Sequence, residues 1–166
     1  MKKLDLFNLV KFDIMKKIEH VWSIICSNST TDQQTNNISL FNVVEKFNVI
    51  VEKKPNLKIE KNKKIIIPFG QEVVTRFRRK VRDVDVLFDI RLDLIDPSGE
   101  ITEGKTVKTI SFLKKFSNMR VVNKVPNLPV EKSGLYNFSI KIREVGETKF
   151  EEVGSIPLEI NTEIKQ

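Results

Sequence analysis

The stretch Val86-Leu-Phe-Asp-Ile-Arg-Leu-Asp-Leu94 decides the fold class of this chain. In an extended conformation, its apolar side chains lie on one side: Val86, Phe88, Ile90, Leu92 and Leu94. Its charged side chains lie on the other side: Asp89, Arg91 and Asp93. A period of two predicts a strand with one buried face and one solvated face. The turn sequence Asp96-Pro-Ser-Gly-Glu100 ends this strand.

The same alternation recurs along the chain. Residues 134–143 carry Tyr136, Phe138, Ile140 and Ile142 on the predicted inner face. Further strand-like segments, bounded by turn residues, are 19–29, 38–51, 65–69, 72–82, 105–113, 117–125 and 149–161. No predicted helix alternates with them, which argues against a parallel α/β sheet. We therefore expect a mainly-β fold, an immunoglobulin-like antiparallel β-sandwich of about eight strands.

The first 18 residues have a different pattern. Phe7, Val10, Ile14 and Ile18 repeat at helical spacing and predict an amphipathic helix. We therefore divide the chain into an N-terminal helical extension, residues 1–18, and a β-sandwich domain, residues 19–166. The simplest role for the helix is packing on the domain. Docking to a partner or a second subunit is an alternative, and Asp5 and Asp13 argue against a helix lying in a membrane surface.

Length and composition indicate a soluble protein that folds without covalent cross-links. A chain of 166 residues is long enough for a substantial core, and its single cysteine, Cys26, has no internal partner. No apolar run approaches the roughly 18 residues of a membrane span. Polar residues such as Asp5 and Asn8 interrupt the start of the chain, which argues against a secretory signal. We expect a cytoplasmic protein.

The net charge of +7 is concentrated in two segments, 52–64 with +4 and 105–124 with +6. Their basic residues are candidate contacts to a polyanion such as a nucleic acid: Lys53, Lys54, Lys58, Lys61, Lys63, Lys64, Lys105, Lys108, Lys114, Lys115, Arg120 and Lys124. An AT-rich coding sequence also produces this lysine-rich composition, so the charge alone is weak support for such a partner. One Trp and one Tyr offer little stacking surface for single strands.

No segment carries a recognisable reaction motif, such as a phosphate-binding loop or a nucleophile elbow. His20 and Cys26 lie about 20 Å apart on one predicted strand, so we expect no Cys–His pair. Cys26 is expected in the core. His20 is the single histidine, which leaves a zinc site of the usual kind short of ligands. We expect no enzyme, no cofactor and no metal, although carboxylate pairs formed by folding are invisible in sequence.

The aspartates between Asp83 and Asp96 invite comparison with a calcium site. Along a strand, however, Asp85, Asp89 and Asp93 follow one another at intervals of about 13 Å and do not converge. The basic segment 72–82 provides a simpler explanation. If 72–82 and 84–95 form a hairpin, Arg76 faces Asp89 and Lys80 faces Asp85, with about 0.2–1 kcal/mol per pair on a solvated face.

Two parts of the sequence resemble a known family. The first is Trp22-Ser-Ile-Ile-Cys26 followed by Asn37-Ile-Ser-Leu-Phe-Asn-Val-Val44, and the second is the pair 88–100 and 134–143. Together they resemble a family of small uncharacterised bacterial and phage proteins, classed as a domain of unknown function. In that family the first strand ends near a cysteine and a late strand reads Gly-x-Tyr-x-Phe. The resemblance covers residues 20–160 and implies a β-sandwich, but no activity.

We therefore expect a non-catalytic β-sandwich that binds a protein partner or assembles with copies of itself. Edge strands such as 65–69 and 149–161 are the candidate contact surfaces. The alternative is a module that binds a polyanion through segments 52–64 and 105–124, with strong salt dependence. The sequence indicates no membrane partner and no small-molecule substrate.

Overall fold

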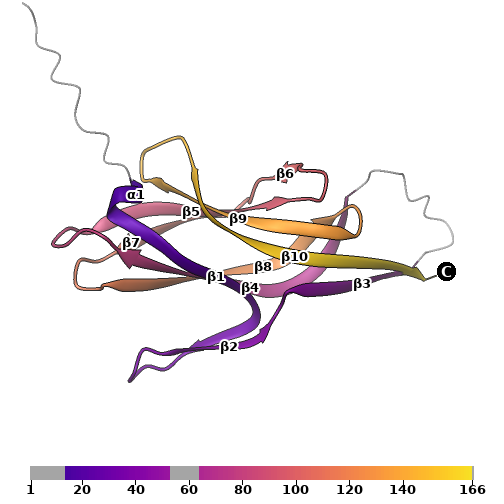
Figure 1. The fold of residues 1–166 in the computed structure, drawn as a ribbon, viewed down its shortest axis with the longest axis horizontal. Coiled ribbons are helices and arrows are strands. Elements are labelled where there is room, and N and C mark those ends of the chain that lie inside the picture. Colours follow the sequence, from indigo (N-terminus) through magenta and orange to yellow (C-terminus); the bar gives the residue numbers. More distant parts are fainter. Residues whose placement is uncertain (1–13, 53–63, 166) are drawn as a thin grey trace, which may run out of the picture.

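A computed structural model of the chain describes residues 14–52 and 64–165, which form a single helical turn and ten strands (Figure 1). The elements are α1 (Ile14–Lys17), β1 (Ile18–Thr31), β2 (Ile38–Val43), β3 (Lys46–Glu52), β4 (Ile65–Arg79), β5 (Val86–Ile95), β6 (Ile101–Thr102), β7 (Val107–Phe112), β8 (Asn118–Val130), β9 (Gly134–Glu144) and β10 (Glu151–Lys165). Residues 1–13 of the expected helical extension lie outside the described residues. No helix in the described part of the chain has the length and apolar character needed to cross a membrane.

The strands form two sheets that pack against each other, so the predicted mainly-β sandwich is confirmed (Figure 1). The first sheet has the order β2-β1-β4-β8, and the second has the order β3-β10-β9-β5-β6, with β7 also paired to β5. All strand pairs are antiparallel except β3 with β10, which is parallel. The expected segment 38–51 is two strands, because the chain leaves the first sheet after Val43 and enters the second at Lys46.

The core lies between the sheets and contains the residues that the alternation places inside. Tyr136, Phe138, Ile140 and Ile142 of β9 are buried, as are Val86, Phe88 and Ile90 of β5. Phe77 of the first sheet meets Phe88 of the second edge to face, with ring centroids 5.3 Å apart. Truncating one of these rings to alanine removes about 3–5 kcal/mol of stability.

The predicted hairpin of 72–82 with 84–95 is wrong. β4 belongs to the first sheet and β5 to the second, so Arg76 does not face Asp89 and Lys80 does not face Asp85. The connection includes Asp83 with a φ of 65°, and it carries the chain across the sandwich instead of folding it back. Arg76 donates instead to Asn118 Oδ1 at 3.2 Å, on the neighbouring strand β8.

The predicted solvated face of β5 is also wrong at its two aspartates, which are buried. Asp89 accepts hydrogen bonds from Thr109 Oγ1 at 2.7 Å and Arg143 Nε at 2.9 Å. The guanidinium groups of Arg91 and Arg143 both stack on the Phe150 ring, at 4.5 and 4.4 Å from its centroid. Long basic side chains and one aromatic ring therefore cover a face that the alternation alone leaves open to water.

Candidate functional site: a groove between the free edges of the two sheets

A groove of about 510 Å³ opens between the two sheets, and we call it the edge groove. β8 is the end strand of the first sheet, and β5 carries β6 and β7 at the corresponding side of the second sheet. Residues from β8, from β5 and from the segment 102–108 line the groove. Its volume falls within the range of about 300–1,000 Å³ that is usual for small-molecule sites.

The floor of the edge groove is apolar and continuous with the core. Leu94 of β5, Leu128 of β8 and Phe138 of β9 line it, and all three side chains are buried members of the core. Leu92 and Ile66 widen the apolar surface. An apolar group placed here exchanges water for contacts with core side chains, which is favourable by about 25 cal/mol per Å² buried.

A tight loop fixes the shape of the groove at Gly104. Its amide donates to Asp93 Oδ1 at 2.9 Å, and a Cβ at this position would lie 2.0 Å from the main-chain oxygen of Leu92. Only glycine therefore allows the loop to lie this close to β5. Asp93 also accepts from Arg91 at 2.9 Å and lies 3.0 Å from Lys141 Nζ, so the loop rests on a paired, buried carboxylate.

Three lysines and one buried amide give the edge groove its polar character. Lys105, Lys108 and Lys124 line it. Asn123 is only 8% exposed, and its side-chain Nδ2 has no hydrogen-bond partner among the residues that the structure describes. Asn123 lies opposite the core residue Val73 in the β4–β8 register, so its side chain points between the sheets. An unsatisfied buried donor costs about 1–3 kcal/mol, which a ligand acceptor would recover.

The groove also has one acidic residue at its rim. Glu103 lines the groove and pairs with Arg91 Nη1 at 3.1 Å. This pairing neutralises its charge locally. The three lysines therefore leave the groove with a positive potential.

The structure separates the basic residues that the sequence groups together. Lys105, Lys108 and Lys124 meet at the groove, whereas Lys114 and Lys115 lie in the turn after β7 and do not line it. Arg120 donates to the main-chain and side-chain oxygens of Asn36. Lys64 bonds Glu100. The other candidates of the first cluster lie outside the described residues: Lys53, Lys54, Lys58, Lys61 and Lys63.

His20 and Cys26 do not form a nucleophile pair. His20 Nε2 lies 2.8 Å from Ser23 Oγ, which donates to Thr75 Oγ1 at 2.9 Å. Cys26 is buried in full, and burial together with the charge of Glu72 raises the pKa of its thiol. The thiol is therefore protonated at neutral pH, as suits a core residue.

Sequence reasoning missed the groove amide and a group of carboxylates. The sequence does not indicate that Asn123 is buried, because a single polar residue in an alternating strand is usually interpreted as facing solvent. A separate cluster of three carboxylates, Asp96, Glu100 and Glu131, forms where the β5–β6 turn meets the β8–β9 turn. The turn sequence 96–100 was recognised, but its partner Glu131 is distant in sequence.

The fold defines the chain as a mainly-β sandwich protein. No protein-family model matches the sequence, and no curated protein matches it. The structure is similar to that of the N-terminal domain of PorA, with a TM-score of 0.27 and 6% sequence identity, over 85% of this chain and 97% of that chain. A likeness of this size identifies neither family nor ligand.

Proposed function

We propose that the protein is a non-catalytic binding module whose edge groove takes a ligand with an apolar body and an anionic head, such as a fatty carboxylate. One observation carries this proposal. The groove combines an apolar floor, continuous with the core, with Lys105, Lys108, Lys124 and the Asn123 side chain, whose Nδ2 finds no hydrogen-bond partner among the described residues. The apolar body lies against Leu94, Leu128 and Phe138, and the head accepts from the lysines and the amide.

The distribution of charge supports a compact anion over a nucleic acid. A polymer follows a continuous basic stripe and stacks its bases on aromatic side chains. Here the described lysines of segment 105–124 are divided between the groove and the turn at Lys114 and Lys115. A short ligand needs only the lysines at the groove. Hydrogen bonds to charged groups contribute about 1.5–3 kcal/mol each, so two or three of them select for the anionic head.

A head-group series tests this proposal. Dodecanoate, dodecyl phosphate, dodecanol and dodecylamine, each below its micellar concentration, are titrated into the full chain by calorimetry. We expect the two anions to bind, and we expect the neutral and cationic compounds to bind at least about tenfold more weakly. Loss of one charged hydrogen bond is enough for this difference, since about 1.4 kcal/mol corresponds to a tenfold change in affinity. Equal binding of dodecanol and dodecanoate contradicts the proposal.

A matched pair of variants locates the site. The double variant Lys105→Gln/Lys124→Gln removes two groove charges, and Lys114→Gln/Lys115→Gln removes two charges from the adjacent turn. We expect the first to weaken dodecanoate binding at least about tenfold and the second to change it less than about twofold. Equal losses in both variants would indicate general attraction to a basic protein and would contradict a groove site.

Self-association is a second candidate, favoured by the exposed apolar residues of β2. β2 is an end strand of the first sheet, and its Phe41 and Val43 are 49% and 55% exposed. In the described registers, residues 65–68 pair only with β8 and residues 151–158 only with β9, so both expected segments keep one unpaired side. The exposed Phe41 and Val43 favour β2 as the surface for pairing with a second copy. Sedimentation velocity over a range of concentrations, with Val43→Glu as the comparison, tests this. A monomer at every concentration contradicts it.

A further inference from the structure

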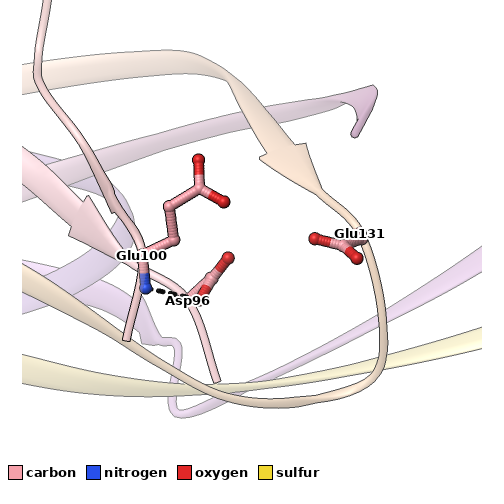
Figure 2. Close-up of side chains that lie close together, drawn as sticks. All are labelled: Asp96, Glu100 and Glu131. Carbon is pink, nitrogen blue, oxygen red and sulfur yellow. Dashed lines mark hydrogen bonds between the residues drawn. The ribbon is translucent and has the colours of Figure 1, made fainter. Parts of the chain in front are cut away.

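Three carboxylates from two turns converge at one end of the sandwich, and we call them the carboxylate cluster (Figure 2). Asp96 and Glu100 begin and end the turn between β5 and β6, and Glu131 follows the last residue of β8. Each residue contributes one oxygen, and the three oxygens lie within 4.8 Å of one another. Like charges this close repel unless a cation lies among them.

Asp96 provides an observation that points to a ligand. The residue is 8% exposed, and its Oδ1 accepts from the amides of Ser98 at 2.8 Å and Glu100 at 2.9 Å. Its other oxygen, Oδ2, is buried without a hydrogen-bond partner in the described part of the chain. Figure 2 shows this second oxygen pointing toward the space between Glu100 and Glu131. Buried carboxylate oxygens nearly always have a donor or a cation beside them.

Lys64 offsets only part of the negative charge of the cluster. Its Nζ donates to Glu100 Oε1 at 2.6 Å and to Thr102 Oγ1 at 3.2 Å, and its charge helps to lower the pKa of Asp96, but no described residue donates a hydrogen bond to Asp96 Oδ2. The Glu131 charge also acts on Lys64, but the two groups form no ion pair in the part of the chain that the structure describes. Three carboxylates and one ammonium leave a net charge of −2, which a divalent cation neutralises.

The β8–β9 turn is fixed by its own hydrogen bonds and lies close against the β5–β6 turn. The Tyr136 hydroxyl, which is buried, accepts from the Glu131 amide at 3.2 Å and donates to the Lys132 carbonyl at 2.8 Å. Gly134 has a φ of 150°, and a Cβ there would lie 2.7 Å from Cγ of Pro97. This close approach keeps Glu131 beside the turn that carries Asp96. The cluster is therefore pre-organised.

We propose that the carboxylate cluster is a binding site for Ca²⁺. Calcium–oxygen bonds of about 2.3–2.6 Å allow the ligand oxygens of one ion to lie up to about 5 Å apart, and the three oxygens of the cluster lie within 4.8 Å of one another. Mg²⁺ demands near-ideal octahedral geometry and loses its water reluctantly, so carboxylates from two separate turns suit the more flexible coordination of Ca²⁺. Both turns are on the surface, so water supplies the remaining ligands. The site does not depend on the ligand proposed for the edge groove.

Calorimetric titration of the full chain with CaCl₂ and with MgCl₂, at fixed KCl concentration and without amphiphile, tests this site. Saturable Ca²⁺ binding that is at least about fivefold tighter than Mg²⁺ binding supports it. Absence of Ca²⁺ binding up to about 10 mM, ten times the weakest dissociation constant usual for extracellular calcium modules, overturns it. Mg²⁺ binding as tight as Ca²⁺ binding also overturns it.

Variants assign the binding to the cluster. Asp96→Asn keeps the Oδ1 acceptor of the turn, and Glu131→Gln changes only a turn side chain, so both are expected to fold. Each should weaken Ca²⁺ binding at least about tenfold, since each removes one of three charged ligands. Lys64→Met should strengthen it severalfold, because it removes a competing positive charge.

Glu147→Gln is the control, since Glu147 is an exposed acid in the turn before β10. It should leave Ca²⁺ affinity unchanged. A loss in Glu147→Gln equal to that in Glu131→Gln would show diffuse attraction to acidic groups and would overturn the site. Unchanged affinity in both cluster variants would overturn it as well. Amide shifts at Ser98, Glu100 and Lys132 on adding Ca²⁺ provide a second readout for a variant that folds poorly.

Discussion

Lys108 on β7 donates a hydrogen bond of 2.7 Å to the main-chain carbonyl of Val122 on β8, and this bond joins the edges of the two sheets. Without it, the carbonyl on the free side of an end strand would be left to water. The bond holds the Lys108 side chain at a fixed position in the edge groove. Asn123 and Lys124, which follow Val122 on β8, also line the groove. Lys108 therefore has a structural role and an electrostatic role at the same site.

Replacing Lys108 by methionine is expected to lower the free energy of unfolding by about 1 kcal/mol, because a single partly buried hydrogen bond is lost while the aliphatic stem is kept. Lys105→Met is the control, since Lys105 is exposed, and it should change stability by less than about 0.5 kcal/mol. Urea denaturation of the three proteins measures both values. Equal stability of the two variants would show that the Lys108 bond does not join the sheets in solution.

Asp93→Asn is expected to destabilise the fold by about 3 kcal/mol, because it leaves the largely buried Lys141 without its countercharge and Arg91 with only the exposed carboxylate of Glu103. Asp93 is 0% exposed and pairs with both Arg91 and Lys141. Glu103→Gln removes the other, exposed partner of Arg91 and should lower stability by less than about 1 kcal/mol. Chemical denaturation measures the free energy of unfolding of both variants and of the original chain. A loss for Asp93→Asn no larger than that for Glu103→Gln would contradict the buried pairing.

The two buried aspartates of β5 predict a loss of stability in acid. Burial by itself raises the pKa of Asp93, but Arg91, the Gly104 amide and Lys141 outweigh it, so the net pKa is lowered below the ordinary 3.8. At Asp89, burial also raises the pKa, but the hydrogen bonds from Thr109 and Arg143 outweigh this effect, so the net pKa of Asp89 is lowered as well. The unfolded chain then binds more protons than the folded one in acid.

The stabilisation from both groups is therefore complete above their unfolded pKa, and it is lost as the pH falls through their folded values. Urea midpoints should stay level from about pH 7 to about pH 5 and should fall below about pH 4. The Asp93→Asn variant should show a shallower fall. An identical acid slope in the variant and the original chain would argue against this origin of the pH dependence.

Gly104→Ala is expected to destabilise the protein by about 3 kcal/mol, at the upper end of ordinary single-residue effects, because the added Cβ would meet the main chain of β5. Gly146→Ala is the matched control. Gly146 has a φ of 96° with open space around it, so alanine there should add only about 1 kcal/mol of backbone strain. Thermal or urea unfolding measures both. A smaller effect at Gly104 than at Gly146 would show that the loop has room to move.

Alternation predicted which residues are buried but not which strands are neighbours. Phe88 and Tyr136 lie in the core as expected, because a period of two defines the face of each strand. The same pattern does not specify pairing. It is compatible with a hairpin of residues 72–82 and 84–95, whereas the connection through Asp83 places β4 and β5 in different sheets.

The candidate sites were only partly accessible from sequence. The lysine-rich segment 105–124 was recognised, but only the folded chain shows that Lys108 and Lys124 meet across two sheet edges while Lys114 lies elsewhere. Asp96 was recognised as a turn residue, and its proximity to Glu131 depends on the contact between Gly134 and Pro97. Contacts between residues this distant in sequence leave no local pattern.

The position of a bound anion in the edge groove is the most direct test of the proposed function. Heteronuclear NMR spectra of the full chain are recorded during titration with dodecanoate, and the side-chain amide of Asn123 and the methyl groups of Leu94 and Leu128 are followed. We expect these signals to shift together and saturate, while the backbone amides of Lys114 and Lys115 stay in place. Shifts confined to other surfaces, or no saturable shift at Asn123, would contradict the assignment of the groove as the binding site.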